Sequence, residues 1–441
     1  MQATPIPSPD LSQKRIFALW LPLAASWLLM AVEMPYISAA LARMNEAERM
    51  IAAFGLAASL SITIESPVIS LLATATALAR SYQNYLMLRR FTWHLMILTT
   101  LLQALLAWTP LFDVIVKGWL NAPPSLHQPV QLGLQLMLPW SAAIAWRRFR
   151  QGILIRYGHS NLVGRGSILR LLSSAGSATL LAVLTPLPGI AVGALALSIG
   201  VVLEALYSHW LSAPIVRERL APGANPRQAE LGYKELLNFH WPLAASNLLY
   251  LFTQPIIAAA LARSPHPELS LAAWPVTSGL LFISRAPEMA LPEVTIALSD
   301  EEHHQAAMRR FGWLVGVGCS VFLFTLSFTP LAEIYFHQLI GVSSELAAMA
   351  RLGVQVALLM PLAMASVVVS RGLLTAQRRT QPQAIAMAVE LAALAGVQLA
   401  GVWLGLPGVP VAAAGLTIAL LIEAFMLNRV LRRTQPKQAG L

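Results

Sequence analysis

The sequence is poor in charged residues and almost without cysteine. Only 11% of its 441 residues are charged, whereas soluble domains carry about 25%. The single cysteine, Cys319, excludes an internal disulfide and a cysteine-based metal site. The chain also lacks a Walker A loop, a GxSxG elbow, an HExxH helix and a dinucleotide-binding fingerprint. We therefore expect no enzymatic activity, no ATP hydrolysis, no cofactor and no resident metal.

Apolar residues are in excess. Hydrophobic residues make up 57% of the chain, and several apolar stretches exceed the roughly 20 residues that a helix needs to cross the bilayer core. The net charge of +10 does not indicate nucleic-acid binding, because the basic residues stand at the ends of the apolar stretches. We expect a multi-pass protein of the cell (inner or plasma) membrane whose surroundings are a lipid bilayer.

A repeat of about 220 residues divides the chain. Residues 22–43 recur at 242–263 with 14 of 22 positions identical. The same spacing of 220 residues relates residues 89–91 to 309–311. It is shorter by one residue near the end of the repeat, where Glu204 matches Glu423. This pattern predicts an N-terminal lobe (1–211), a cytoplasmic linker (212–236) and a C-terminal lobe (237–441) related by pseudosymmetry.

The predicted fold class is an all-α membrane protein with twelve transmembrane helices in two parallel six-helix repeats. The predicted spans are 17–42, 51–79, 92–116, 129–153, 167–185, 189–210, 237–262, 271–298, 311–332, 346–370, 384–404 and 409–429. Loops on the side of the two termini hold most of the Lys and Arg residues, so both termini are predicted to be cytoplasmic. Because each repeat has an even number of transmembrane helices, both repeats enter the membrane from the same side.

Prolines stand inside the predicted spans at matching repeat positions. The matched pairs are Pro22 and Pro242, Pro35 and Pro255, and Pro67 and Pro287. Each removes a backbone donor and bends or breaks its helix. This predicts bends in helices one, two, seven and eight where they line a central cavity, although prolines are also ordinary in membrane helices.

Charged residues inside the spans are the candidate site. The arginines are Arg147, Arg150, Arg170 and Arg285, and the glutamates are Glu33, Glu65, Glu288 and Glu390. A charge in the hydrocarbon costs a few kcal/mol or more, so a cavity, partner or substrate is expected beside it. In the repeat Glu65 matches Arg285, and Arg170 matches Glu390. This change of sign predicts charges facing each other across the two halves; pairing within one helix, as between Arg285 and Glu288, is the alternative.

The run Trp146-Arg147-Arg148-Phe149-Arg150 contains three arginines. The matching residues 367–370 of the second half are three valines and a serine, so a mainly apolar run is tolerated at this depth. Arg147 and Arg150 are three residues apart and share a helix face. The three arginines of the run are predicted to form a cationic vestibule at the cytoplasmic mouth, with snorkelling arginines that set topology as the alternative. Glu204 and Glu423 are expected to be structural and to pair with loop arginines. His303 and His304, in a polar loop with Glu301 and Glu302, are expected to be solvated rather than to bind metal.

Short similarities to a known family are spread along the whole chain. They are Trp241-Pro242-Leu243-Ala244, Phe54-Gly55-Leu56-Ala57, Ala145-Trp146, Gly152-Ile153-Leu154 and Leu162-Val163-Gly164. With the two six-helix repeats, they make the chain resemble the MATE-like multidrug/oligosaccharidyl-lipid/polysaccharide exporter (MOP) superfamily, and within it the progressive ankylosis (ANK) family. The resemblance implies rocker-switch alternating access and export of small polyanions such as pyrophosphate, citrate or nucleotides.

The functional hypothesis is an alternating-access secondary transporter that exports small organic or phosphorylated anions as a monomer. The four arginines of the candidate site attract the anion. The four glutamates balance those charges or carry a coupling ion, H⁺ or Na⁺. Two alternatives stay open: a cation-coupled multidrug antiporter that uses Glu33 and Glu65 as cation sites, and a flippase for lipid-linked precursors.

Overall fold

The computed structural model describes residues 12–222, 232–298, 304–377, 379 and 381–434. Within these residues the chain forms helices and no strand. Ten helices are long and apolar enough to cross a membrane, and an eleventh follows if α17 and α18, bent by 48°, make one span. The fourth predicted span, over α7 and α8, is not among them, because α8 carries four arginines. The all-α multi-pass fold is confirmed, and the count of twelve stays a prediction.

The first half contains α1 (Gln13–Ala31), α2 (Glu33–Leu41), α3 (Ala47–Ile64), α4 (Ser66–Ile69), α5 (Leu71–Leu78), α6 (Tyr82–Trp108), the π-helix η1 (Asp113–Trp119), the 3-10 turn η2 (Pro124–Leu126), α7 (His127–Leu136), α8 (Leu138–Arg156), α9 (Ser160–Leu184) and α10 (Gly189–Arg219). The second half contains α11 (Tyr233–Leu251), α12 (Thr253–Leu261), α13 (Pro267–Arg285), the 3-10 turn η3 (Ala286–Ala290), α14 (Leu291–Leu298), α15 (His304–Phe328), α16 (Leu331–Glu333), the π-helix η4 (Ile334–Ile340), α17 (Ser344–Val356), α18 (Met360–Ala376), α19 (Gln381–Trp403) and α20 (Gly408–Thr434).

Several predicted boundaries need correction; α9 and α15, for example, begin at Ser160 and His304 rather than at 167 and 311. Helix α6 begins at Tyr82 rather than at 92, because the Ser81 hydroxyl accepts a hydrogen bond from the Asn84 amide and caps the helix there. Helix α10 continues to Arg219, so the predicted linker at 212–236 begins inside a helix. Part of that linker, residues 223–231, lies outside the described residues.

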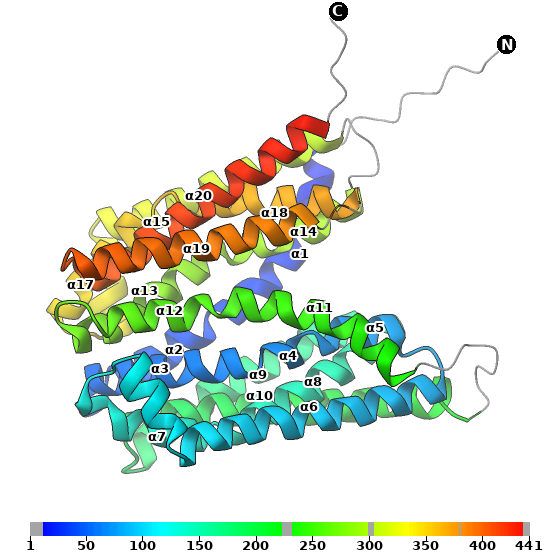
Figure 1. The fold of residues 1–441 in the computed structure, drawn as a ribbon, viewed down its shortest axis with the longest axis horizontal. Helices are drawn as coiled ribbons and strands as arrows, with labels where there is room; N and C mark the ends of the chain where they lie inside the picture. The colour runs from blue at the N-terminus through cyan, green and yellow to red at the C-terminus, as the bar shows by residue number, and fades with distance from the viewer. Residues whose placement is uncertain (1–11, 223–231, 299–303, 378, 380, 435–441) are drawn as a thin grey trace, which may run out of the picture.

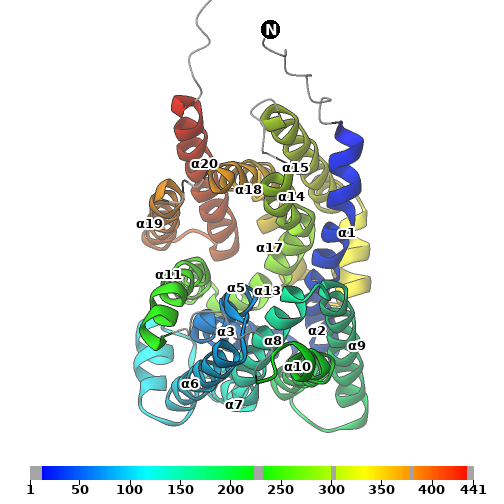
Figure 2. The same ribbon diagram turned by 90° about the vertical axis from the view of Figure 1, so that its right-hand side faces the viewer.

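Two lobes make up the molecule (Figures 1 and 2). The lobe drawn lower in Figure 1 contains α2–α10, and the upper lobe contains α12–α20. The lobes lie close together at the end of α2, α3 and α12, and they diverge toward the end where α1 begins and α20 ends. We call these the closed end and the divergent end.

Four membrane helices break at matching repeat positions, as the prolines predict. The breaks fall at Val32 between α1 and α2, at Phe252 between α11 and α12, at Glu65 between α3 and α4, and at Arg285 between α13 and η3. Pro35, Pro67, Pro255 and Pro287 follow within three residues. In the first turn of a helix a proline removes no intrahelical bond, so it favours a new start there.

The first helix of each half packs mainly against the opposite lobe. Helix α1 packs against η3 and α14, and α11 packs against α4, while each also touches its own lobe. Equivalent bonds fix both crossings: Trp20 Nε1 donates to the Pro287 carbonyl at 2.8 Å, and His240 Nε2 lies 3.0 Å from the Pro67 carbonyl. Positions 20 and 240 match in the repeat, as do 67 and 287. These bonds satisfy carbonyls beside helix breaks, where no lipid group could.

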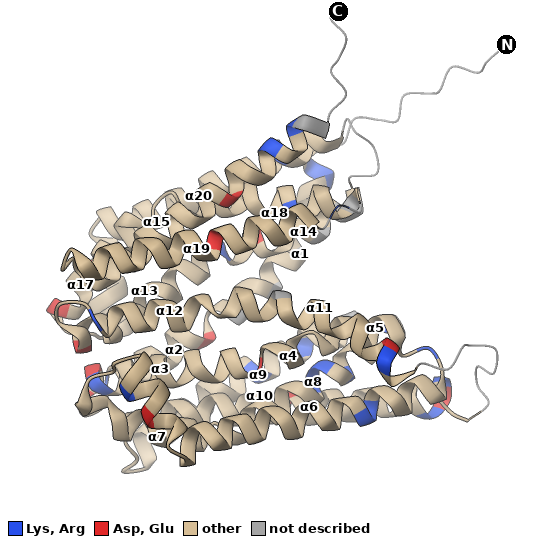
Figure 3. Ribbon diagram, in the orientation of Figure 1, with Lys and Arg blue, Asp and Glu red and all other residues tan. Residues whose placement is uncertain are grey.

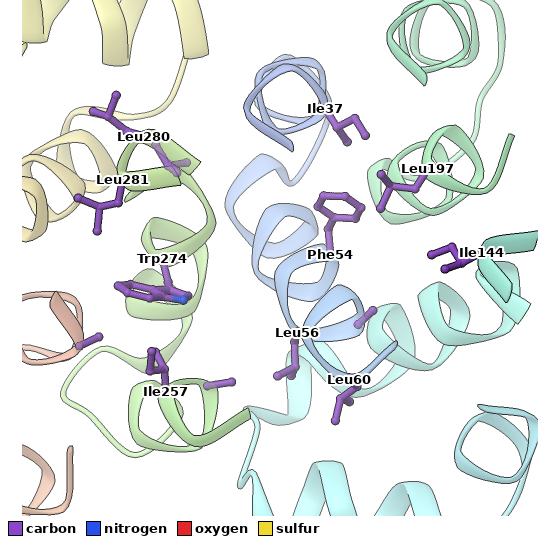
Figure 4. Packing of buried hydrophobic residues seen from close by; sticks show 14 of the residues in the cluster. Ile37, Phe54, Leu56, Leu60, Ile144, Leu197, Ile257, Trp274, Leu280 and Leu281 are labelled. Atoms are coloured by element: carbon purple, nitrogen blue, oxygen red, sulfur yellow. The ribbon is translucent and has the colours of Figure 1, made fainter. Parts of the chain in front are cut away.

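The apolar cores of the two lobes are built alike. Phe54, fully buried, lies beside Ile37, and its repeat equivalent Trp274 lies beside Ile257, the equivalent of Ile37 (Figure 4). Between these cores Gly55 of α3 meets Pro275 of α13, again two equivalent positions. A Cβ atom at Gly55 would overlap with the Pro275 ring. The close packing of the two lobes at the closed end therefore requires a glycine at position 55, where equivalent residues of the two repeats meet at the pseudo-two-fold axis.

Replacing Gly55 with leucine is expected to destabilise the closed end by about 1–3 kcal/mol, the usual cost of overpacking a tight contact. The melting temperature of the purified protein should fall accordingly. Gly176→Leu in α9 is the matched control, because no atom lies within 4 Å of a Cβ at that position. Equal melting temperatures for the two variants would contradict the dyad contact.

Candidate functional site

A buried ion pair ties the break in the first helix to α9. Glu33, the first residue of α2, pairs with Arg170, with 2.8 Å between Oε2 and Nη2. Ser174, one turn further along α9, donates its hydroxyl to Glu33 Oε1 at 2.7 Å. Glu33 and Arg170 are both buried. The glutamate that begins α2 is thus neutralised and held by a neighbouring helix of its own lobe.

Glu204 of α10 is the centre of the same network. Its carboxylate is fully buried and forms an ion pair with Arg147 of α8. Gln151 donates to Glu204 Oε1 at 3.0 Å, and Arg170 Nη1 lies 3.8 Å from Glu204 Oε2. Two arginines and two glutamates therefore form one cluster inside the N-terminal lobe.

The C-terminal lobe holds an equivalent cluster with different side chains. Arg371 of α18 pairs with Glu423 of α20 at 2.6 Å and with Glu390 of α19 at 3.5 Å. Arg371 stands at the repeat position of Gln151, and Glu390 at that of Arg170. In this lobe the arginine stands on the fourth helix of the repeat, whereas the N-terminal cluster has arginines on both the fourth and the fifth helices.

The predicted pairing across the two halves is therefore wrong for Arg170 and Glu390, since each has its partners inside its own lobe. Glu65 and Arg285, the other matched pair, stand at the breaks that end α3 and α13. In the described part of the chain neither forms an ion pair, and the alternative pair of Arg285 with Glu288 is not formed either. Glu288 is buried, and its side-chain neighbours include Arg285 and the thiol of Cys319.

Arg150 lies apart from the ion clusters. Its guanidinium carbon is 4.6 Å from the Trp146 ring centroid, a cation–π arrangement. Trp146 also packs against Trp93 and His209. Arg147 and Arg150 were predicted to share one vestibule, but they have different neighbours because Arg147 contacts α10 and Arg150 stacks on the aromatic group.

Sequence reasoning placed Arg148 only in the vestibule and missed Arg371. The predicted tenth span ended at 370, one residue short of Arg371, which was therefore counted with the loop. Arg148 has a buried Nε without a hydrogen-bond partner in the described residues, and its charge neighbours are Arg147, Arg170, Glu204 and Glu65. Glu204 and Glu423 were expected to pair with loop arginines, but their partners lie on helices.

The described residues contain no group of three His, Cys, Asp or Glu side chains that could hold a metal ion. His303, Glu301 and Glu302 of the two-histidine loop lie outside those residues.

Pseudosymmetric hydrogen bonds join the lobes at the closed end. Arg43, at the end of α2, donates to the carbonyls of Gln338, Leu339 and Ile340 at 3.1, 2.8 and 3.0 Å. Its repeat equivalent Arg263 donates to the carbonyls of Leu120, at 3.0 Å, and Trp119. Each arginine thus caps the C-terminus of a π-helix of the other lobe, where the helix dipole favours a cation.

Two serine–carboxylate bonds complete this closure. Ser343, the N-cap of α17, donates to Glu48 of α3, and Ser125 of η2 donates to Glu268 of α13. Glu48 and Glu268 are equivalent in the repeat. We call the two arginines and the two serine–glutamate pairs the latch. Figure 3 shows charged residues at the helix ends on this side of the molecule.

The comparisons with known proteins concern the fold. An inward-facing structure of a multidrug resistance MATE family transporter of the MOP superfamily matches with a TM-score of 0.69 at 13% identity, over 95% of this chain and 99% of that one. The inward-closed lipid II flippase MurJ matches with 0.70 at 11% identity, over 93% and 87%. An outward-facing MATE family structure matches with 0.60 at 16% identity, over 96% and 97%. The chain has the MATE-like fold.

No protein-family model matches the sequence, and no curated protein matches it significantly. The MATE-like fold of the first resemblance is confirmed, and the narrower resemblance to the ANK family stays a prediction.

Glu204→Gln is expected to destabilise the protein by about 3–5 kcal/mol, because it leaves two buried arginines without a full counter-charge. The double variant Glu204→Gln/Arg147→Gln should recover part of the loss. Thermal unfolding in detergent measures both. Asp113→Asn is the control, because the Asp113–Lys117 pair is half exposed and contributes at most about 1 kcal/mol. A melting temperature of Glu204→Gln equal to that of the wild type would contradict the structural role of this cluster.

Proposed function

We propose that this protein is an alternating-access secondary transporter. The observation that carries the proposal is the latch, which closes one end of the molecule with bonds that follow the internal repeat. The lobes diverge at the other end, and four helices break at equivalent positions between them. Alternating access by rocking requires two lobes that can close against each other at one end while they separate at the other, and the pseudosymmetric latch provides such a closure. Similarity to transporter and flippase folds supports the same function.

The conformation corresponds to an inward-facing state. The positive-inside rule puts the basic loops and both termini in the cytoplasm, which makes the latch the external closure. The higher TM-score with the inward-facing than with the outward-facing MATE family structure supports this orientation. The protein acts in the cell membrane, and each monomer contains the complete pair of lobes.

The proposed substrates are small organic or phosphorylated anions, such as citrate, pyrophosphate or nucleotides. Arg148 in α8 and Arg285 at the end of α13, one in each half, form no ion pair in the described part of the chain. An unpaired cation in the membrane is costly, so an anionic ligand is the expected partner. Arg147 and Arg170 are held by carboxylates and position the cluster beside Arg148.

The coupling ion is proposed to bind at Glu65 and Glu288, which form no ion pair in the described part of the chain. The carboxylate of Glu288 lies beside the Cys319 thiol, and Glu65 has one buried oxygen without a hydrogen-bond partner among the described residues. A carboxylate in this position can take up H⁺ or Na⁺. Glu33 is less suited, because Arg170 and Ser174 already occupy its oxygens.

The flippase is the second candidate function, because the match to MurJ is as good as that to the MATE family structure. A cation-coupled multidrug antiporter is the third, and it would need Glu65 or Glu288 as its cation site, since Glu33 is paired.

Arg148→Gln and Arg285→Gln are each expected to lower uptake of labelled citrate or pyrophosphate into proteoliposomes about tenfold or more, because each removes a charge-assisted bond to the anion. Arg90→Gln is the matched control, since Arg90 is exposed on α6. Melting temperatures close to that of the wild type establish that the variants fold.

Wild-type uptake in both variants would remove these arginines from the site. Transport of ethidium-like cations by the wild type, without transport of citrate or pyrophosphate, would favour the antiporter. Movement of a fluorescent lipid-linked precursor between leaflets, again without anion transport, would favour the flippase.

Arg43→Ala combined with Arg263→Ala is expected to open the closed end. Accessibility is measured by labelling Gly279→Cys with a membrane-impermeant maleimide in a Cys319→Ala background. Position 279 is covered by Pro35 of the other lobe, since a Cβ there would lie 3.1 Å from Pro35 Cγ. Loss of several hydrogen bonds to charged donors should raise the labelling rate about tenfold or more.

Lys117→Ala is the control for this test, because Lys117 lies in η1 at the same end and pairs within it, with Asp113. A labelling rate that stays at the wild-type level without both arginines, or rises equally in the control, would contradict the latch.

A further inference from the structure

A cavity of about 640 Å³ lies in the C-terminal lobe outside the ion clusters. Helix α18 forms its floor, and α15 and α20 form its walls. In Figure 2, α18 lies between α15 and α20 within the upper lobe, and both neighbours extend further from the other lobe. All residues that line the cavity belong to these three helices, so it lies within the C-terminal lobe and not between the lobes, and its volume is typical of a ligand site.

Three arginines line this cavity: Arg309 near the start of α15, and Arg429 and Arg432 near the end of α20. In the described part of the chain none of them forms an ion pair. Nε and Nη2 of Arg309 are buried without a hydrogen-bond partner among those residues. Three cations around one cavity repel one another unless an anion lies between them.

The floor of the cavity is polar. Asn428 donates through Nδ2 to Ser366 Oγ at 2.9 Å, and Ser370 Oγ lies 3.5 Å from Asn428 Oδ1. Hydroxyl and amide groups beside arginines are the usual ligands of phosphate oxygens. At the rim, the exposed side chains of Trp313 and Phe425 add two aromatic surfaces.

The internal repeat shows that this cavity is specific to one lobe. Ser366 and Ser370 match Trp146 and Arg150 of the N-terminal lobe, and Asn428 matches His209. There Trp146 packs between Trp93 and His209, and Arg150 stacks on it, so side chains fill the equivalent space. The small residues of α18 leave the same space empty in the C-terminal lobe.

We propose that this cavity binds the phosphate of an anionic phospholipid. The arginines stand at the divergent end, where the sequence places the cytoplasmic leaflet and its anionic lipids, and basic pockets between membrane helices on that side bind such headgroups. Trp313 and Phe425 lie where aromatic side chains contact the interface and the first part of the acyl chains. The occupant belongs to the bilayer and is distinct from the transported anion.

The test is lipid binding by the purified full-length protein, measured by native mass spectrometry with phosphatidylglycerol and phosphatidylcholine as probes. The wild type should retain phosphatidylglycerol and not phosphatidylcholine. Arg309→Gln should weaken phosphatidylglycerol binding about tenfold through the loss of charge-assisted bonds. Ser366→Trp, which introduces the residue that fills the N-terminal lobe, should abolish it.

Arg310→Gln is the matched control, because Arg310 adjoins Arg309 in sequence but is exposed and does not line the cavity. Phosphatidylglycerol bound by Arg309→Gln and Ser366→Trp as tightly as by the wild type would overturn the proposal. A second outcome would also overturn the proposal. In it, inorganic phosphate or pyrophosphate raises the melting temperature of the wild type but not that of Arg309→Gln or Ser366→Trp, while phosphatidylglycerol raises the melting temperature of none of the three proteins. A melting temperature of Ser366→Trp near that of the wild type shows that filling the cavity leaves the fold intact.

Discussion

Inside a bilayer a polar group has no water to bind, and this constraint shapes the molecule. Each helix break exposes backbone groups, and each buried carboxylate carries a charge that lipid cannot solvate. Trp20 and His240 form hydrogen bonds with backbone carbonyls beside the helix breaks of the opposite lobe, and Arg170 forms an ion pair with Glu33, the first residue of α2. The crossing of α1 and α11 between the lobes, and the close packing of α8, α9 and α10, place these partners within reach.

The two halves keep one backbone plan and distribute charge differently over it. Glu204 and Glu423 are shared, whereas Arg170, on the fifth helix of the first repeat, is replaced by Glu390 in the second. Arg371, on the neighbouring helix, compensates for that change. The N-terminal cluster balances two arginines against two glutamates, and the C-terminal cluster has one arginine for two glutamates. Lobes of equal shape thus offer a solute chemically unequal surfaces.

Much of the fold could be predicted from the sequence, because it depends on local properties. Apolar length gives the helices, and prolines at repeated positions mark the breaks at Glu65 and Arg285. The partners of the buried charges could not be predicted in this way. A repeat shows which residues are equivalent, but not which helices are neighbours, so Arg170 and Glu390 were matched to each other rather than to Glu33 and Arg371.

The crossing of α1 has a consequence for biosynthesis. Ribosomes make this helix well before its main packing partner, η3, which follows only after residue 285. Until then Trp20 has no carbonyl acceptor, and the segment must wait in the membrane beside an unfinished N-terminal lobe. Contacts of such long sequence separation form late, so α1 gains its main contacts only after synthesis of the C-terminal lobe has begun.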